Sequence, residues 1–174
     1  MSILKRFVSY YKPYRHLFYM DCVCATVLCI IDLSFPQILR WLPEGLFSGS
    51  AASIFSALRW LFPVLLIWYL LRALCQFYVT SFGHVMGTRM ETDMRQDLFD
   101  KYMSLSYSYY DQNNTGEMMS RLVSDLFDIS ELAHHGPENL LMCSIKIIGS
   151  FILLLWVNVP MTMLLLAVTA VLVI

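Results

Sequence analysis

Long apolar runs, separated by short polar segments, divide the chain. A helix needs roughly 20 apolar residues to cross a bilayer core, and the pattern predicts first, second and third long helices over residues 16–41, 55–108 and 125–157. The second predicted helix extends beyond its membrane-spanning part. Past Gly87 one apolar stripe continues at helical spacing, with charged residues on the other faces. Such a stripe requires another projecting helix to pack against. It consists of Met86, Met90, Met94, Leu98, Tyr102 and Leu105.

A strong turn signal, Tyr110–Gly116, ends this helix. Asn114 is placed to cap a following helix, and Glu117 stands three residues later, as in a variant of the capping box. Gly116 permits another surface to approach the backbone closely. The pattern predicts a short amphipathic helix over residues 114–123 that presents itself to a partner. The simpler alternative is that these residues only close a tight helical hairpin.

The first 14 residues form an amphipathic pattern, which predicts a helix lying in the membrane interface; a disordered basic tail is the alternative. Pro36 and Pro43 are expected to end the first span, before an external loop over residues 44–53. Four basic residues precede the first span, so the positive-inside tendency predicts a cytoplasmic N-terminus. These residues are Lys5, Arg6, Lys12 and Arg15.

The third long helix begins with polar turns, where Ser124 or Asp125 can serve as its cap. His134 and His135 suggest a metal or proton-relay role, but a polar turn outside the bilayer favours two solvated side chains. Pro137 should kink the helix. After an external turn at residues 158–160, the apolar segment 161–174 is too short to cross, so we expect the start of a fourth span and a longer protein beyond it.

Composition supports a multi-pass protein of the cell membrane. Apolar residues make up 58% of the chain and charged residues 14%, with a mean hydropathy of +0.60. The net charge of −1 gives no reason to expect nucleic acid as a partner. The five cysteines lie in apolar runs without paired metal-ligand spacing, and they are expected to be small buried hydrophobic residues. We predict no catalytic residue, cofactor site or metal site in this chain.

Three charged residues fall within apolar runs: Asp32, Arg72 and Lys146. Charges are costly there and usually face protein or a water-filled cavity. At about 1.5 Å per residue, all three lie within roughly 13 to 21 Å of the external surface, so they are able to meet. One interpretation is that the cluster lines a substrate cavity. The favoured interpretation is structural, either as a buried ion pair that fixes helix positions or with Lys146 snorkelling inward.

The segments around the second helix resemble the N-terminal part of the transmembrane domain of ATP-binding cassette (ABC) exporters of the multidrug and lipid-flippase type. That family has a basic residue before Leu-Phe, two aromatic residues with an Asp, then Thr-Gly-Glu, Ser-Arg-Leu and an Asp. The resemblance covers the whole chain, although residues 1–41 match only in pattern. Its matching segments are Arg72-Ala73, Met90–Phe99 and Tyr109–Asp125.

The resemblance implies an all-α membrane fold, with an interfacial elbow helix over residues 1–14 and a partial transmembrane domain over 15–174. It also implies that the short helix is the first coupling helix, which rests on a nucleotide-binding domain. Its partners would be the bilayer, that domain and a second transporter half, as a homodimer or heterodimer. The residues that would carry the coupling role are Asn114, Thr115, Gly116, Glu117, Met118, Met119, Ser120 and Arg121.

One departure from the family limits what this chain does alone. The sequence contains no Gly-x-x-x-x-Gly-Lys-Ser/Thr phosphate-binding loop and only three complete spans of the family's six. ATP and Mg²⁺ are therefore expected in the full-length protein and not in this chain, which is not itself an enzyme. The alternative functions are a non-transporting sensor or anchor and an inactive remnant of a transporter. The transported substrate is not readable from the residues.

Overall fold

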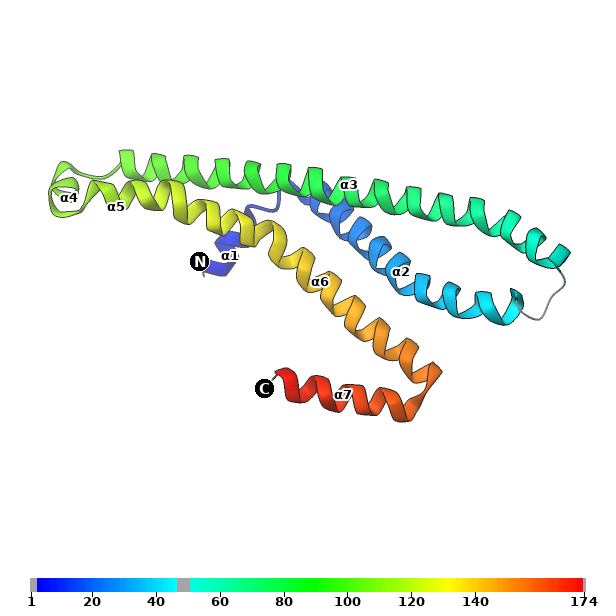
Figure 1. Cartoon of the computed structure of the whole chain (residues 1–174). Helices are drawn as coiled ribbons and strands as arrows, with labels where there is room; N and C mark the ends of the chain where they lie inside the picture. Colours follow the sequence, from blue (N-terminus) through cyan, green and yellow to red (C-terminus); the bar gives the residue numbers. More distant parts are fainter. Residues whose placement is uncertain (1–2, 47–50, 174) are drawn as a thin grey trace. The chain divides into compact units, whose positions relative to one another are not determined.

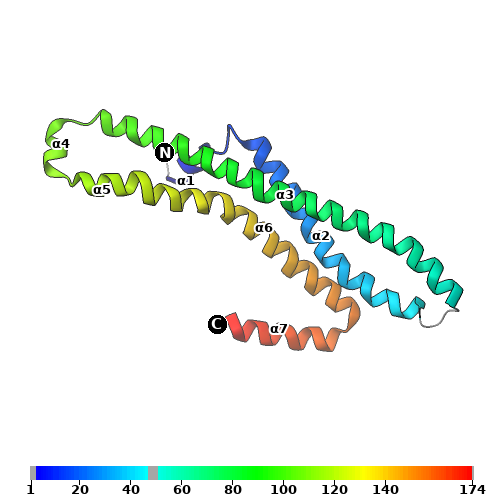
Figure 2. The same ribbon diagram turned by 45° about the horizontal axis from the view of Figure 1, so that its top comes forward.

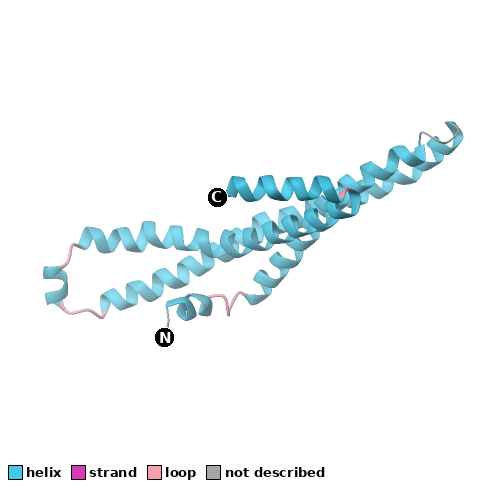
Figure 3. Cartoon of the chain, turned by 90° about the horizontal axis from the view of Figure 1, so that it is seen from below, coloured by secondary structure: helices cyan, strands magenta, loops and turns pink. Residues whose placement is uncertain are grey.

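A computed structural model describes the backbone of residues 3–46 and 51–173, and the side chains of residues 5–40 and 59–172. Every regular element in these ranges is helical, as Figures 1 and 3 show. The expected all-α membrane fold is confirmed. The elements are α1 (Ile3–Ser9), α2 (Arg15–Leu46), α3 (Ala51–Met103), α4 (Tyr107–Gln112), α5 (Thr115–Ser120), the π turn η1 (Arg121–Asp125), α6 (Leu126–Val157) and α7 (Val159–Val173).

Three helices are long and apolar enough to cross a membrane, within the described residues: Arg15–Arg40, Arg59–Met103 and Thr115–Val157. The apolar segment Val159–Leu172 is shorter. Helix α3 has 53 residues, more than twice the roughly 20 that a bilayer core requires. The long second helix predicted from the stripe is therefore present, although it ends at Met103 and not near residue 108.

Proline does not end the first long helix, contrary to expectation. Helix α2 includes both Pro36 and Pro43 and continues to Leu46, while α3 begins at Ala51 and includes Pro63. Residues 44–46 and 51–53 of the expected external loop are thus helical, and the rest of that loop lies outside the described residues. Each proline removes one backbone donor, but in apolar surroundings the remaining helical hydrogen bonds face no competition from water.

The chain forms two compact units. The first comprises Met1–Ala25 and Leu74–Asn139, and the second comprises Thr26–Ala73 and Leu140–Ile174. In the first unit, the C-terminal half of α3 lies beside α5 and the start of α6, and α4 connects them at one end (Figures 1 and 2). This arrangement provides the partner that the apolar stripe of α3 requires.

The methionines of that stripe form the core of the first unit, which confirms that the stripe is packed against another helix. Met86, Met90 and Met94 are buried against Leu126 and Ala133 of α6. Methionine side chains are unbranched and fill irregular gaps between helices well. Partly buried aromatic residues of the N-terminal segment also pack against this cluster: Phe7, Tyr10, Tyr11, Tyr14 and Phe18.

The N-terminal helix α1 is shorter than expected and ends at Ser9. Tyrosines in the following turn attach this segment to the long helices. Tyr10 donates a hydrogen bond to Asp97 Oδ2 at 2.6 Å, and Tyr14 donates one to Asp93 Oδ2 at 2.9 Å. These contacts attach the segment to α3 in the first unit.

A third tyrosine satisfies a backbone group that a proline leaves unpaired. Pro137 lies inside α6 and has no N–H, so it cannot donate the helical hydrogen bond to the carbonyl of Ala133. The hydroxyl of Tyr11 donates to that carbonyl oxygen at 2.6 Å. Burial raises the pKa of Tyr11 above its usual value, so its hydroxyl is protonated and able to donate. This contact ties the N-terminal segment to α6.

Close helix packing and a capped turn characterise the second unit. A Cβ atom on Gly149 of α6 would lie 2.5 Å from Leu33 Cδ1 of α2, so the absent side chain allows the two helices to approach. Helix α7 starts directly after Asn158, whose side-chain Oδ1 accepts a hydrogen bond from the N–H of Met161 at 3.2 Å. Asn158 thus serves as the N-cap of α7.

Candidate functional site

The end of the first unit at which α3 stops contains an element that the turn signal did not predict. Helix α3 tightens in its last turn, where the N–H of Leu105 donates to the carbonyl of Tyr102 at 2.9 Å. The hydroxyl of Tyr110 donates to the same carbonyl at 2.6 Å. Tyr110 belongs to α4, a short helix where a simple turn was expected. Its phenol supplies a partner to a carbonyl at the helix end.

Helix α5 begins where the sequence predicts, and Asn114 is its N-cap. The backbone of Asn114 is extended, and its side-chain Oδ1 accepts a hydrogen bond from the N–H of Gly116 at 2.9 Å. The expected reciprocal half of a capping box is replaced by another contact: the carboxylate of Glu117 pairs with Arg121 one turn later at 2.6 Å. Both charged side chains are exposed.

The short helix is not separate from the third long helix, contrary to expectation. Helix α5, the π turn η1 and α6 follow one another without a non-helical residue, so Ser124 and Asp125 lie within η1 and do not cap a new helix. A π turn changes backbone hydrogen bonding without breaking the helix, which explains the continuity. Arg95 Nε of α3 donates to the carbonyl of Leu122 in this turn at 3.2 Å. Glu91 pairs with Arg95.

The faces of α5 differ in burial. Met118 points inward and is 9% exposed, whereas its neighbour Met119 is 60% exposed. Val123, one turn beyond Met119, is also exposed. The segment therefore presents apolar side chains outward next to the exposed Glu117–Arg121 ion pair. A surface of this kind, at the joint between two long helices, is suited to contact with another protein domain.

The three intramembrane charges meet within the second unit. Asp32 of α2 accepts from Arg72 Nε of α3 at 3.1 Å and from Lys146 Nζ of α6 at 2.8 Å. Their side chains are 30–40% exposed in this chain. One carboxylate thus joins three helices that are distant in sequence. The sequence indicated this meeting, because the number of residues between each charge and the external end of its helix placed all three at a similar distance from the external surface.

Two cavities flank this ion cluster. One of about 410 Å³ is lined by Ile31, Phe35, Trp68 and Tyr69 together with Asp32 and Arg72. The other, of about 360 Å³, is lined by residues that include Asp32, Lys146 and Ser150. The indole N–H of Trp68 is buried without a hydrogen-bond partner among the described residues. Such a donor is available to a polar group that enters the first cavity.

The histidines of α6 differ from the solvated pair that the sequence favours. His134 is buried and only 3% exposed, because its ring lies over Gly83 of α3, where a Cβ atom would overlap it. His135 is partly exposed. Both rings contact a third histidine, His84 of α3, which the sequence pattern did not indicate. Two glycines four residues apart, Gly83 and Gly87, are the signal for close helix approach that would have pointed to it.

Comparison of the sequence with known proteins gives one family match and several similar transporters. Residues 18–174 match the family described as "ABC transporter transmembrane region". The chain is 41% identical over 157 residues to an uncharacterized ABC transporter ATP-binding protein, YwjA, of Bacillus subtilis. It is 24% identical over 169 residues to the putative multidrug export ATP-binding/permease protein YgaD of the same organism. It is also 26% identical over 162 residues to an ATP-dependent lipid A-core flippase of Thiobacillus denitrificans.

These alignments cover most of this chain but a minor part of each relative. The alignment with YwjA spans 90% of this chain and 27% of YwjA. The alignment with YgaD spans 94% of this chain and 29% of YgaD, and that with the flippase spans 93% of this chain and 28% of the flippase. The chain thus spans less than a third of the length of these relatives. The similarity concerns their membrane-embedded portion.

Proposed function

The chain belongs to the ABC transporter transmembrane family, and from this membership we propose that it supplies membrane helices and the first coupling helix of an ATP-driven exporter. The observation that carries the proposal is the capped helix α5, which connects α3 to α6 at one end of the first unit and exposes Met119. A joint between helices far longer than a bilayer requires is suited to transmit force from a partner outside the membrane.

The coupling role is assigned to residues 114–121. Asn114 fixes where the helix starts, and Gly116 leaves room for close approach of a nucleotide-binding domain. Met119 provides apolar contact, while Glu117 and Arg121 provide exposed charges at its edge. Met118 faces inward and anchors the helix to its own unit.

Movement of α5 would reach both long helices through contacts that already exist. Because α5 continues through η1 into α6, a displacement of α5 acts directly on that helix. Arg95 holds the carbonyl of Leu122 in η1 and pairs with Glu91, so α3 is connected at the same level. We infer that α3, α5 and α6 move together when the nucleotide-binding domains close. Differential binding of ATP to the open and closed states would supply the free energy.

ATP and Mg²⁺ enter this proposal only through a nucleotide-binding domain. The sequence contains no Gly-x-x-x-x-Gly-Lys-Ser/Thr loop, so that domain belongs to another part of the polypeptide or to a partner chain. The second transporter half is an identical or a related chain. The N-terminus and α5 are assigned to the cytoplasmic side, because basic residues cluster before the first span.

The cluster of Asp32, Arg72 and Lys146 is assigned a structural role. Its ion pairs join α2, α3 and α6 at one level of the second unit, and an isolated charge at such a position is costly. The adjacent cavities leave room for substrate beside the cluster. The structural role requires only that the carboxylate remain paired.

The test uses the full-length transporter in lipid vesicles with Met119→Glu. A new charge on the exposed face of α5 should lower ATP-driven transport and reduce the stimulation of ATP hydrolysis by substrate. Met103→Glu is the matched control, because Met103 is similarly exposed, at 69% against 60%, but lies at the end of α3. Equal transport by the wild type and the Met119→Glu variant would reject the coupling role. Absence of ATP-driven transport by the wild type would instead favour a sensor or anchor that does not transport.

A further inference from the structure

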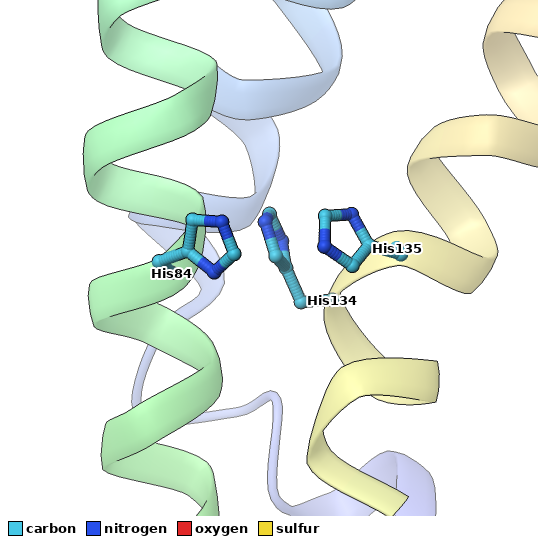
Figure 4. A group of neighbouring side chains, drawn as sticks. All are labelled: His84, His134 and His135. Carbon is cyan, nitrogen blue, oxygen red and sulfur yellow. The ribbon is translucent and has the colours of Figure 1, made fainter. Parts of the chain in front are cut away.

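Three histidines from two helices converge in the first unit. His84 belongs to α3, and His134 and His135 to α6; Figure 4 shows the ring of His134 between the other two. The ring centroids lie 5.0 Å apart for His84 and His134, 5.3 Å for His84 and His135, and 4.4 Å for His134 and His135. One ring nitrogen of each residue lies within 4.8 Å of the others. The cluster plays no part in the coupling role proposed above.

The central ring is buried with unused hydrogen-bonding capacity. His134 is 3% exposed, and its Nδ1 has no hydrogen-bond partner among the described residues. Buried polar nitrogens normally have a partner, because leaving one unpaired costs free energy. Packing alone does not explain a histidine here, since an apolar side chain of similar size would fill the space above Gly83 without that cost. The unpartnered nitrogen therefore indicates a ligand.

Carboxylates surround the imidazoles. Glu138 is buried, and its Oε2 lies 3.9 Å from His134 Nε2 and 3.9 Å from His135 Nδ1. Asp21 of α2, also buried, has an unpartnered Oδ1 and forms a second close group with His134 and Glu138. The adjoining cavity, of about 510 Å³, has no Lys or Arg among the residues described as lining it. A site rich in imidazole and carboxylate groups attracts a cation.

We propose that His84, His134 and His135 bind a divalent transition-metal ion of the zinc class through one ring nitrogen each, with the carboxylate of Glu138 beside the other nitrogen of His134. Three imidazole nitrogens, with a water molecule in the fourth position, are a common donor set for tetrahedral Zn²⁺. Ligand atoms around such an ion are about 3.3 Å apart, for metal–nitrogen bonds of about 2.05 Å. The nitrogens start within 4.8 Å of one another, and His84 is the exposed member of the cluster.

Glu131 positions one of these ligands. Its Oε2 lies 3.4 Å from His135 Nε2, on the opposite side of the ring from the Nδ1 atom that faces Glu138. A carboxylate that holds the proton on one imidazole nitrogen leaves the other nitrogen free to bind metal. His135 therefore coordinates through Nδ1, and Glu131 fixes the ring orientation.

The bound ion would connect α3 to α6 beside Gly83. These are the two helices that the coupling segment joins, so the ion would restrict their relative movement at a second level. Metal binding is thus expected to stabilise the protein against unfolding and to slow ATP-driven transport. The binding itself does not depend on transport, because it requires only the three histidines.

Zinc binding to the purified full-length protein tests the proposal. After treatment with a chelator, the protein is titrated with Zn²⁺ by calorimetry, and with Co²⁺ for the visible absorption of a tetrahedral site. The wild type should bind one ion per chain at this site. His84→Ala and His134→Ala should each abolish that binding, and Glu131→Gln should weaken it about 10- to 100-fold. His16→Ala is the matched control, because His16 is exposed and belongs to neither close group of ligand atoms, and it should bind as the wild type does.

The thermal unfolding midpoint provides a second readout. Zn²⁺ should raise the unfolding midpoint of the wild type and of His16→Ala, but not that of His84→Ala. Because His84 is exposed, the His84→Ala variant should fold as the wild type does when no metal is bound. Undiminished Zn²⁺ binding by His84→Ala and His134→Ala would overturn the proposal, because the ion would then be bound elsewhere. Absence of Zn²⁺ binding by the folded wild type would also overturn it.

Discussion

Substitution of the two glycines in α3 should have opposite effects on stability. A Cβ atom on Gly83 would overlap the ring of His134, lying 2.7 Å from Nε2 and 2.8 Å from Nδ1. The ring is buried and flanked by two other imidazoles, so it has little room to move. A Cβ atom on Gly87 would instead meet His134 Cβ at 3.4 Å and the carbonyl of Ser130 at 3.7 Å, which are ordinary contacts.

The expected magnitudes follow from these distances. Alanine is about 1 kcal/mol more favourable than glycine inside a helix. Gly87→Ala should therefore stabilise the protein by up to about 1 kcal/mol. Gly83→Ala gains the same helix propensity but incurs about 1–3 kcal/mol of overpacking, so the net effect should be destabilising by up to about 2 kcal/mol.

Unfolding of the two alanine variants in detergent, followed by circular dichroism, measures this difference. The free energy of unfolding should be about 1–3 kcal/mol lower for Gly83→Ala than for Gly87→Ala. The comparison is internal, because both variants add the same methyl group to the same helix. If Gly83→Ala were as stable as Gly87→Ala, His134 would not lie against Gly83 and the packing of α3 on α6 would be wrong.

Three further predictions concern single contacts. Tyr11→Phe should destabilise the protein by about 1 kcal/mol in unfolding titrations. The loss should be smaller in a Pro137→Ala background, because the substituted alanine supplies a backbone N–H to the carbonyl of Ala133, and an equal loss in both backgrounds would refute the contact. Asp32→Asn should destabilise the protein by about 1–3 kcal/mol while transport of every substrate persists, whereas loss of transport by a stable variant would assign the ion cluster to substrate. Asn114→Ala should lower stability by about 1 kcal/mol and Asn114→Ser by less, as measured by chemical denaturation; identical losses would show that no cap is lost.

Local patterns predicted the helices and the cap. The methionine stripe of α3 and the cap at Asn114 each depend on residues within a few positions of one another, so the sequence was sufficient. The end of α2 was wrong, because Pro36 and Pro43 were judged by rules for water-exposed helices. Helix α4 was missed because Tyr110 serves the carbonyl of Tyr102, a contact that the turn pattern does not reveal.

Contacts between distant segments were harder to predict. Asp32, Arg72 and Lys146 were brought together by counting depth along rigid helices, which is a one-dimensional argument. The burial of His134 depends on the register of α6 against α3, and nothing on α6 alone specifies it. The hydrogen bond from Tyr11 likewise depends on where the N-terminal segment packs against α6. Pro137 alone indicates only that the carbonyl of Ala133 lacks its helical donor.

The side of the membrane on which α5 lies tests the account most directly. Met119→Cys, introduced after the five native cysteines are replaced, provides a single exposed thiol on that helix. A membrane-impermeant maleimide should label it in inside-out vesicles and not in right-side-out vesicles, and bound nucleotide should reduce the labelling as a nucleotide-binding domain covers the residue. Labelling from the external side would place α5 outside the cell and contradict the coupling role.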